Sequence, residues 1–417
     1  MADTSPSELL VVQARNIVFE MWKVAALVSF IALAHAAPHA EFTPINEFAL
    51  RLLDNTYAFQ ESFGRKNVAI SPLSVWNTYT LLSEAASGET FQELKSTLRL
   101  PDDAQMSQWL HTNAVNLMRS GNKDVTVQGT AAMFIDCMFN IHREFCQAAK
   151  LYSNLYKVEN IGNTTAVAEE INYYLCEATN GKIRNSVKPD QLENLRLILV
   201  DALYFKAPWK HPFDVTQTRE EPFYDSLGRM IGSVNMMFHK AAHTVGESSL
   251  IGASVLEMAY GRDEEYAMLV LLPFEGMPIK VLLNNLASKP YLDWMTEFRS
   301  EGSLPSIDVF LPRFKMSTQT DLVPPLQYTG IRRIFDEKTA ELPGIASEPL
   351  YVSKTIQNVE IDVNEEGTEA ASTTVVGLQD RFLGQRFEVN KEFVFLIVDR
   401  RSNVILFAGV YGEPSLV

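Results

Sequence analysis

The residue types with the clearest chemistry lie in residues 363–398, VNEEGTEAASTTVVGLQDRFLGQRFEVNKEFVFLIV. Three acids surround Gly367, small and β-branched residues follow, and an isolated Arg381 then stands beside Phe382. A serine protease with an acidic specificity pocket binds an arginine guanidinium through two parallel hydrogen bonds. The Arg381-Phe382 peptide bond is therefore one that such a protease would attack, and it follows a half-polar segment with the composition of a strand.

Motifs for catalysis or nucleotide binding are absent from the sequence. It contains no G-x-S-x-G elbow, H-E-x-x-H zinc site, P-loop or G-x-G-x-x-G fingerprint, and its seven histidines offer few candidates for the base of a hydrolytic triad. His239 and His243 have a spacing that brings two ligands to one metal in a helix, but the residues around them, including Gly246, favour strand and turn. No third ligand stands at a supporting position. We therefore predict a protein that is not an enzyme and has no metal and no cofactor.

Composition and charge limit the fold and the partners. The chain has 417 residues, of which 47% are apolar, so it is long enough to bury a large core. Its formal net charge is −15, which repels phosphates and favours basic partners. We predict that it binds no nucleic acid.

The N-terminal region has the pattern of a secretory signal. In residues 21–36, MWKVAALVSFIALAHA, a lysine precedes an apolar run, and Ala34-His35-Ala36 forms a small-x-small cleavage site. The run is short for a membrane span, so we predict a leader over 1–36, no membrane anchor, and a secreted, extracellular protein. A buried N-terminal helix is the alternative, and the pattern leaves open whether translation starts at Met1 or Met21.

Cysteines and one sequon fit an extracellular protein that is not built on disulfides. Cys137, Cys146 and Cys176 are odd in number, so at least one thiol is free or paired with another molecule, and we expect all three to be buried and inert. Asn163-Thr164-Thr165 is an N-x-S/T sequon in a polar stretch, which predicts a glycosylated surface loop at Asn163.

Helical patterns dominate the front of the chain and strand patterns the back. Residues 45–53 place apolar side chains at helical spacing, and Ser71 with Pro72 marks the start of a second helix. Continuous apolar runs such as 195–205 and those near the C-terminus predict strands. Without a repeat or a linker, this order predicts a single α+β domain over 37–417.

Six motifs in a fixed order resemble those of the serpins, the large serine-protease inhibitors. They are NVAISPLSV (67–75), ATNGKI (178–183), LYFKAPWKHPFD (203–214), TREEPF (218–223), LPRFK (311–315) and FVFLIVDRRSNVILFAGVYGEP (393–414). The resemblance implies about nine helices packed around three β-sheets, with an exposed reactive loop over about 365–387. It also implies a monomer that inhibits trypsin-like extracellular serine proteases irreversibly. In that mechanism the protease forms an acyl-enzyme, and the cleaved loop then inserts into the main sheet as an additional strand.

The loop has the side chains that insertion requires. The resemblance assigns the hinge to Glu365, Glu366, Gly367, Thr368, Glu369, Ala370, Ala371 and Ser372. Alternate residues from Thr368 to Leu378 are small and then apolar, with no charge and no proline, so one face of the segment can enter a packed core. A bulky or charged residue at Thr368 or Ala370 would block the first step.

Family spacing places the reactive bond at Arg381-Phe382, thirteen residues after Thr368. The implied partner is a trypsin-like serine protease in a covalent complex. Two bonds within reach, Arg386-Phe387 and Phe382-Leu383, are the alternatives.

Departures from the family pattern concentrate under the strand that must open. The resemblance places a polar cluster on Ser71, Ser74, Asp201 and Gln357, where the family has two serines, an asparagine and a histidine. Asp201 can accept a hydrogen bond from the Gln357 amide, and burial should raise the pKa of its carboxyl. The alternative is that Asp201 reaches water and has no regulatory effect.

Two further correspondences concern the hinge and an accessory ligand. Arg313 is implied to lie opposite Glu365, with Trp209 nearby, as an anchor of the hinge. The region matching the heparin-binding helix of some serpins holds only Arg119 and Lys123, so we predict no heparin activation.

The competing functional class is a non-inhibitory serpin, such as a carrier, storage protein or chaperone. The hinge of such a serpin usually contains a charged, proline or bulky residue that prevents insertion.

Overall fold

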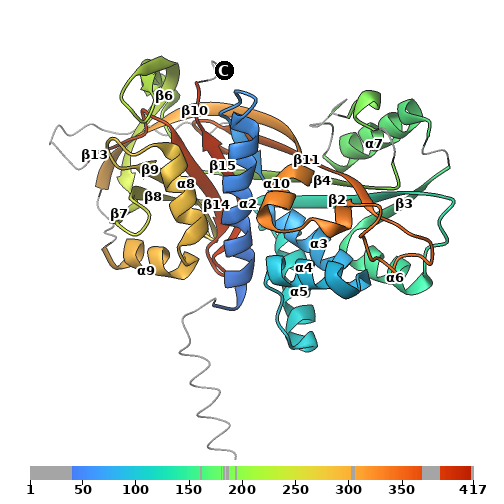
Figure 1. Ribbon diagram of the computed structural model, residues 1–417. Coiled ribbons are helices and arrows are strands. Elements are labelled where there is room, and N and C mark those ends of the chain that lie inside the picture. Colours follow the sequence, from blue (N-terminus) through green and yellow to red (C-terminus); the bar gives the residue numbers. More distant parts are fainter. Residues whose placement is uncertain are drawn as a thin grey trace, which may run out of the picture. The chain divides into compact units, whose positions relative to one another are not determined.

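Figure 1 shows the computed structural model of the chain. It describes residues 40–414 except 160–161, 180, 182–183, 185–186, 193–194, 302–305 and 369–385. The leader over 1–36, the hinge residues Glu369, Ala370, Ala371 and Ser372, and the bond Arg381-Phe382 lie outside the described residues. Contacts group the chain into two units, Met1–Glu41 and Phe42–Val417, and all that follows concerns the second.

Nine α-helices occur in the described part of the chain, as the family resemblance implied. They are α2 (Thr43–Glu61), α3 (Pro72–Ala85), α4 (Gly88–Leu98), α5 (Ala104–Met118), α6 (Arg143–Tyr152), α7 (Thr164–Ala178), α8 (Ile279–Ser288), α9 (Tyr291–Glu301) and α10 (Val323–Thr329). Short 3-10 turns are η1 (Ala40–Phe42), η2 (Pro189–Gln191), η3 (Val215–Gln217) and η4 (Arg333–Phe335). The amphipathic run at 45–53 lies within α2, and Ser71 and Pro72 begin α3, so both helix predictions are confirmed.

The strands of the described residues form a six-stranded sheet and a nine-stranded one, and the second divides at β10 into two sheets. In chain order they are β1 (Val68–Ile70), β2 (Thr126–Asp136), β3 (Asn154–Val158), β4 (Leu197–Pro208), β5 (Arg219–Tyr224), β6 (Met230–Ala242), β7 (Thr244–Ser248), β8 (Ala253–Tyr260), β9 (Tyr266–Pro273), β10 (Ser306–Asp321), β11 (Val352–Val363), β12 (Gly367–Thr368), β13 (Arg386–Glu388), β14 (Phe393–Asp399) and β15 (Val404–Tyr411). One sheet has the order β1-β15-β14-β9-β8-β7.

The long strand β10 belongs to the other two sheets. Its second half, from Phe314 to Asp321, pairs with β11 in what we call the main sheet, β3-β2-β4-β12-β11-β10. Its first half, from Ser306 to Arg313, pairs with β6, beside which β5 lies. Sixteen residues in one strand therefore hold the two sheets together.

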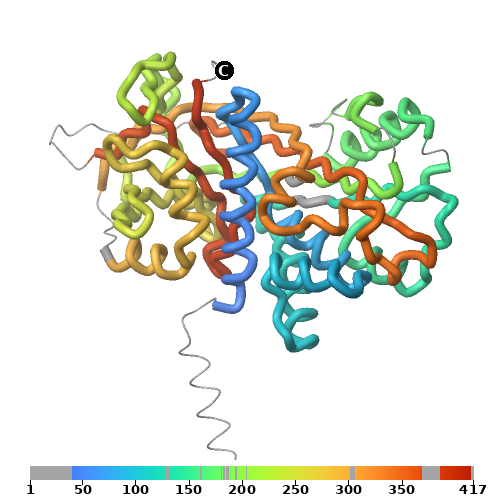
Figure 2. The backbone as a smooth tube through the Cα atoms, in the orientation of Figure 1, coloured from blue at the N-terminus to red at the C-terminus, as the bar shows by residue number. Residues whose placement is uncertain are grey.

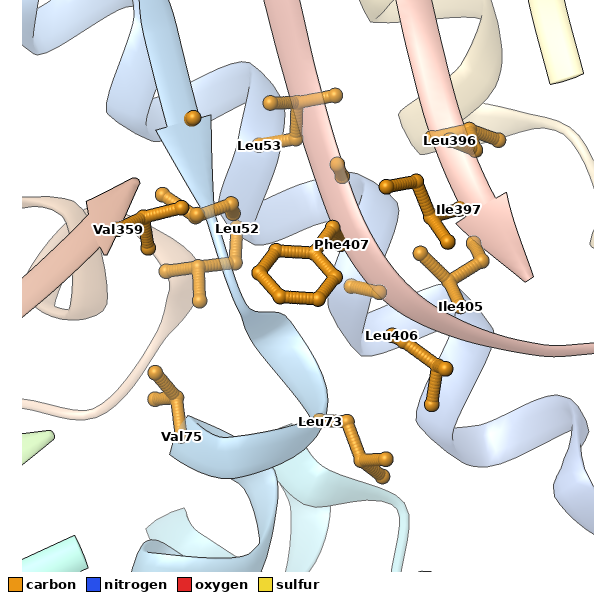
Figure 3. Close-up of a cluster of buried hydrophobic side chains, with 14 of the residues drawn as sticks. Leu52, Leu53, Leu73, Val75, Val359, Leu396, Ile397, Ile405, Leu406 and Phe407 are labelled. Carbon is orange, nitrogen blue, oxygen red and sulfur yellow. The ribbon is translucent and has the colours of Figure 1, made fainter. Parts of the chain in front are cut away.

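The core lies where α2 packs on the sheets. In Figure 2, α2 runs alongside the C-terminal strands, and α2 and β15 are in contact. Every residue of β14 and β15 is buried, which explains why both read as continuous apolar runs rather than alternating ones. Leu52, Val359 and Phe407 gather in one buried cluster (Figure 3). The α+β fold class is confirmed, and no helix in the described residues has the length and apolar character needed to cross a bilayer.

Candidate functional site

The start of the hinge is already a strand of the main sheet. Gly367 and Thr368 form β12, which pairs antiparallel with Pro208 and Ala207 of β4, while Thr368 also pairs with Val363 of β11. Below this point β4 and β11 pair directly with each other, as parallel strands. The hinge therefore occupies the upper end of the gap between β4 and β11 and is aligned to continue into it.

Gly367 is required at its position for two reasons. Its φ is 155°, which L-residues with a side chain rarely adopt. A Cβ atom there would overlap the carbonyl oxygen of Ala207 and the Cα atom of Pro208. Only glycine lets the hinge approach β4 this closely.

Thr368 is packed against aromatic rings. It is 1% exposed, and its Oγ1 shares a hydrogen bond of 2.8 Å with the hydroxyl of Tyr260. The Tyr260 ring stacks on Trp209, with ring centroids 4.4 Å apart and planes 11° apart. The first inserted side chain thus already lies in a closed, apolar place.

Backbone hydrogen bonds fix the residues before the strand. Trp209 donates from its backbone N–H to the Glu366 carbonyl at 2.8 Å and from its indole Nε1 to the Asn364 carbonyl at 2.9 Å. Phe213 donates from its backbone N–H to the Glu365 carbonyl at 2.8 Å. The segment 209–213 is therefore the anchor of the hinge, and the sequence pointed to Trp209 but not to Phe213.

The Glu365 carboxylate is buried and has two partners. Thr218 donates from Oγ1 to Oε1 at 2.6 Å, whereas Arg313 Nη1 lies 3.9 Å from Oε2. The structure thus brings Arg313 and Glu365 together, as the resemblance implied. Their distance of 3.9 Å is too long for a hydrogen bond, so Thr218 is the closer partner of the carboxylate. Sequence reasoning missed Thr218, although it begins the motif TREEPF; its spacing carries no signal that it meets a carboxylate far along the chain.

We expect loss of the Thr218 hydroxyl to cost more than loss of the Arg313 charge. Thr218→Val leaves one oxygen of a buried carboxylate without its donor, which costs about 1–3 kcal/mol of unfolding free energy. Arg313→Gln removes a long ion pair whose arginine is partly exposed to solvent, and such a pair contributes less than about 1 kcal/mol. Urea unfolding of both variants checks the order, and a larger loss in Arg313→Gln would contradict it.

The side chains of Ser74, Asp201 and Gln357 and the backbone of Ser71 meet under the pairing between β4 and β11. Gln357 and Asp201 are register partners, and Gln357 Nε2 donates to Asp201 Oδ2 at 2.8 Å. Gln357 also bridges the backbone of Ser71, accepting from its N–H and donating to its carbonyl, both at 2.9 Å. Ser74 donates from Oγ to Asp201 Oδ1. The four are at most 4% exposed, so this cluster links α3 to the two strands that insertion must separate.

Burial dominates the ionisation of Asp201. It raises the pKa of this carboxyl to about 7, and the hydrogen bonds from Ser74, Gln357 and the Ala202 backbone only partly oppose it. The expectation of a desolvated carboxyl hydrogen-bonded to Gln357 is therefore confirmed. The alternative in which Asp201 reaches water is wrong, because the side chain is enclosed between α3 and the sheet.

Comparison with known proteins identifies the family. Residues 43–414 match the family model for the serpins, described as serine protease inhibitors. The chain is a serpin. A serine protease inhibitor of Cyanea capillata is 30% identical over 354 residues, covering 84% of this serpin and 93% of the relative.

Solved structures agree on the fold. Serpin48, a highly specific serpin of the insect Tenebrio molitor, is 25% identical with a TM-score of 0.75, over 90% of this chain and 99% of that one. Human thyroxine-binding globulin has a TM-score of 0.79 over the same shares at 24% identity, a likeness that shows the fold alone.

Asn163 lies at the surface, at the N-terminus of α7. Its Oδ1 accepts a hydrogen bond of 3.2 Å from the backbone N–H of Ala166, as an N-cap residue does. A glycan is attached through the other atom of the amide, Nδ2, so the cap and a glycan are compatible. Glycosylation itself stays a prediction.

The expectation that all three cysteines are buried is wrong. Cys137 is exposed, and Cys146 and Cys176 are half-buried; all three are free. Cys137 lies in the turn that follows the end of β2, where its Sγ contacts the Glu159 carbonyl at 3.4 Å. The general tendency of cysteine to be buried does not predict that this particular cysteine lies in an exposed turn.

The segment around His239 is a strand, as predicted, yet the expectation that His239 and His243 converge only in a helix is wrong. His239 lies in β6, His243 is the residue between β6 and β7, and their Nε2 atoms are 2.9 Å apart. Among the described residues no three His, Cys, Asp or Glu side chains are already spaced to hold a metal ion.

Proposed function

We propose that this serpin is a suicide-substrate inhibitor of trypsin-like extracellular serine proteases. The observation that carries the proposal is the position of Gly367 and Thr368 as a strand between β4 and β11. Because the first residues of the loop already lie between β4 and β11, the rest of the loop can insert by extending the same strand.

Strand pairing supplies a driving force for insertion. At present β4 and β11 share one parallel ladder from Val352 to Val359. An inserted loop runs antiparallel to both strands, as β12 already does, and replaces that ladder with two antiparallel ones. Antiparallel pairing is slightly more stable per residue, and the number of pairings doubles, so cleavage of the loop releases a favourable change.

The length of the loop favours Arg381 over the alternative at Arg386. A strand rises about 3.3 Å per residue, so the thirteen steps from Thr368 to Arg381 reach about 43 Å, a little more than the about 36 Å of the eleven steps from Val352 to Val363 in β11. Full insertion then carries Arg381 to the opposite end of the sheet. A bond five residues later would leave slack between the sheet and the protease.

The covalent step uses the protease's own chemistry. The protease serine attacks the Arg381 carbonyl, its histidine passes the proton to the Phe382 nitrogen, and the chain from Phe382 onward leaves with a new amino terminus. Arg381 remains as an ester on the serine, and insertion of residues after Thr368 displaces the acyl-enzyme before water hydrolyses the ester. One molecule is consumed for each protease trapped, so the serpin is not a catalyst.

We also propose how the protein is processed and where it acts. The mature protein is a monomeric domain over 37–417, secreted after removal of 1–36 and glycosylated at Asn163. The signal pattern of residues 21–36 and the surface position of Asn163 support this. Neither heparin nor nucleic acid takes part.

A gel and a mass measurement test the proposal. Mixed with trypsin, the purified protein is expected to form a complex that survives SDS, together with a released fragment that begins at Phe382. Arg381→Ala should abolish the complex, and Arg386→Ala, which removes the alternative site, should leave it intact. Cleavage at Arg381 without a complex would show a substrate or a carrier and overturn the inhibitory proposal.

A further inference from the structure

A cavity of about 330 Å³ opens where the C-terminal end of α2 meets the main sheet, and we call it the α2 cavity. Its floor is formed by residues of β10 and β11, among them Lys354 and Ile356. Gln357 contacts Ser71 at the start of α3, and side chains alternate along a strand, so Lys354 and Ile356 lie on the opposite face of the sheet. The volume lies at the lower end of the range of small-molecule pockets, so the cavity has room for one small ligand.

Two phenylalanines and an isoleucine give the α2 cavity an apolar wall. Phe59, in the last turn of α2, and Phe63, just after the helix, meet edge to face with ring centroids 5.2 Å apart. Phe63 is 66% exposed, whereas Ile356 is only 4% exposed. A ligand whose apolar part covers the Phe63 ring therefore removes from water a surface that the folded chain leaves exposed.

The α2 cavity also contains one cation without an acidic partner. Lys354 is neutralised by Asp321, with 2.8 Å between Nζ and Oδ2. Arg65 instead donates from Nη1 to Oε1 of Gln60 at 3.2 Å, and in the part of the chain that the structure describes no carboxylate forms an ion pair with it. Gln60 is 6% exposed, so this bond holds the guanidinium at the cavity. The cavity therefore carries an unbalanced positive charge in a chain with a formal net charge of −15.

We propose that the α2 cavity binds a small amphipathic monoanion, and that a fatty or aromatic carboxylate is the chemical class that fits. The apolar part of the ligand packs on Phe63 and Ile356, and its carboxylate accepts two parallel hydrogen bonds from the Arg65 guanidinium. A cationic ligand is repelled by Arg65, and a hydrated inorganic anion leaves the apolar wall uncovered. Because Asp321 already neutralises Lys354, one negative charge on the ligand balances the cavity.

The α2 cavity spans two parts of the main sheet that separate during insertion. Gln191 of η2 lines it together with Gln319 of β10, with 3.5 Å between Nε2 and Oε1. The turn η2 contacts α7 and precedes β4, whereas β10 is paired with β11. A loop strand inserted between β4 and β11 moves these strands about 4.8 Å further apart, so Gln191 then leaves Gln319.

A ligand in the α2 cavity should therefore favour the sheet as it is before insertion. Because the ligand binds this form more tightly than the inserted one, it also slows insertion. The effect on insertion rests on the proposed function, whereas binding itself does not.

A fluorescence titration of the full chain tests the site. The probe is anilinonaphthalene sulfonate, an aromatic body with one sulfonate, and decanoate is the competitor. We expect decanoate to displace the probe from one saturable site, and decanol, which has the same chain without the charge, to displace it at least about tenfold less effectively. Arg65→Gln and Phe63→Ser should each weaken decanoate binding at least about tenfold, through loss of the charged hydrogen bonds and of the apolar contact.

Leu227→Ser is the matched control, because Leu227 is 63% exposed in the turn between β5 and β6, outside the cavity. This variant should bind decanoate like the wild type. With wild-type protein, saturating decanoate should slow formation of the trypsin complex without changing trypsin's hydrolysis of a small substrate.

The possible results separate the site from its effect on insertion. Absence of decanoate-displaceable binding to the wild-type chain, or equal binding in Arg65→Gln and Phe63→Ser, overturns the site, and equal displacement by decanol overturns the assignment of an anion. If decanoate binds but the rate of trypsin complex formation is unchanged, the link to insertion is wrong while the site stands. If no trypsin complex forms at all, the proposed function fails, and the titration still reports on the cavity.

Discussion

Replacement of Thr368 with arginine is expected to convert this serpin from an inhibitor into a substrate. Thr368 is 1% exposed, and its hydroxyl meets Tyr260, which in turn stacks on Trp209. An arginine side chain would have to displace these rings or bury an unpaired charge, and either costs several kcal/mol. Insertion would therefore stop at its first residue, while the Arg381-Phe382 bond stays available to the protease.

The measurement is the number of inhibitor molecules consumed for each trypsin molecule inactivated. We expect this ratio to rise from near one to above about ten in Thr368→Arg, with loss of the SDS-stable complex and with cleavage after Arg381 retained. Glu366→Arg is the matched control, because it adds the same side chain at a half-buried position outside β12 that the anchor holds through its backbone carbonyl. A Thr368→Arg protein that still traps trypsin with a ratio near one would show that the hinge does not insert in this register.

Helices and strands of this fold could be predicted where the environment of the side chains is uniform along the element. Strands β14 and β15, for example, are buried throughout, and their continuous apolar sequences indicate this burial. The main-sheet cluster was predictable for a different reason. The family resemblance placed Asp201 opposite Gln357, and elementary hydrogen-bond chemistry then predicted the contact between them.

What could not be predicted depends on how distant segments pack. Thr218 meets Glu365 across 147 positions of the chain, and the polarity of neither residue reveals the other. His243 lies between β6 and β7 and meets His239 of β6, whereas a regular strand would hold two residues four positions apart well separated. His211 adds a third ring from another segment. In each case the local pattern was interpreted correctly, and the contact was set by the tertiary structure.

Asp201 should make the stability of this serpin fall as the pH rises from about 4 to about 7. Its pKa is 3.8 without burial and about 7 in the folded chain, so between these values the folded state holds a proton that the unfolded state has lost. The favourable term is complete below pH 3.8 and is lost as the pH rises through about 7. Three pKa units correspond to about 4 kcal/mol, an order-of-magnitude figure for this single group.

Asp201→Asn should remove this dependence and raise stability at pH 8. The amide can accept from Gln357 Nε2 through its oxygen, and its nitrogen can donate to Ser74 Oγ, a bond in the opposite direction to the one that Ser74 now donates to Asp201; the amide thus keeps two hydrogen bonds and carries no charge. The urea midpoints of variant and wild type should coincide near pH 4 and separate toward pH 8, with the variant the more stable. Asp321→Asn, in β10 of the same sheet and paired with Lys354, is the control that should not show this separation.

The same substitution should slow inhibition at pH 8, because the cluster joins β4 to β11 and both must part for the loop to enter. Ionisation of Asp201 places an uncompensated charge between these strands and weakens the closed sheet, which lowers the barrier to opening. In wild-type protein the rate of trypsin complex formation, corrected for trypsin's own pH dependence with an unrelated inhibitor, should therefore rise through pH 7. If the wild type and Asp201→Asn show the same corrected profile, the carboxyl does not control the opening of the sheet.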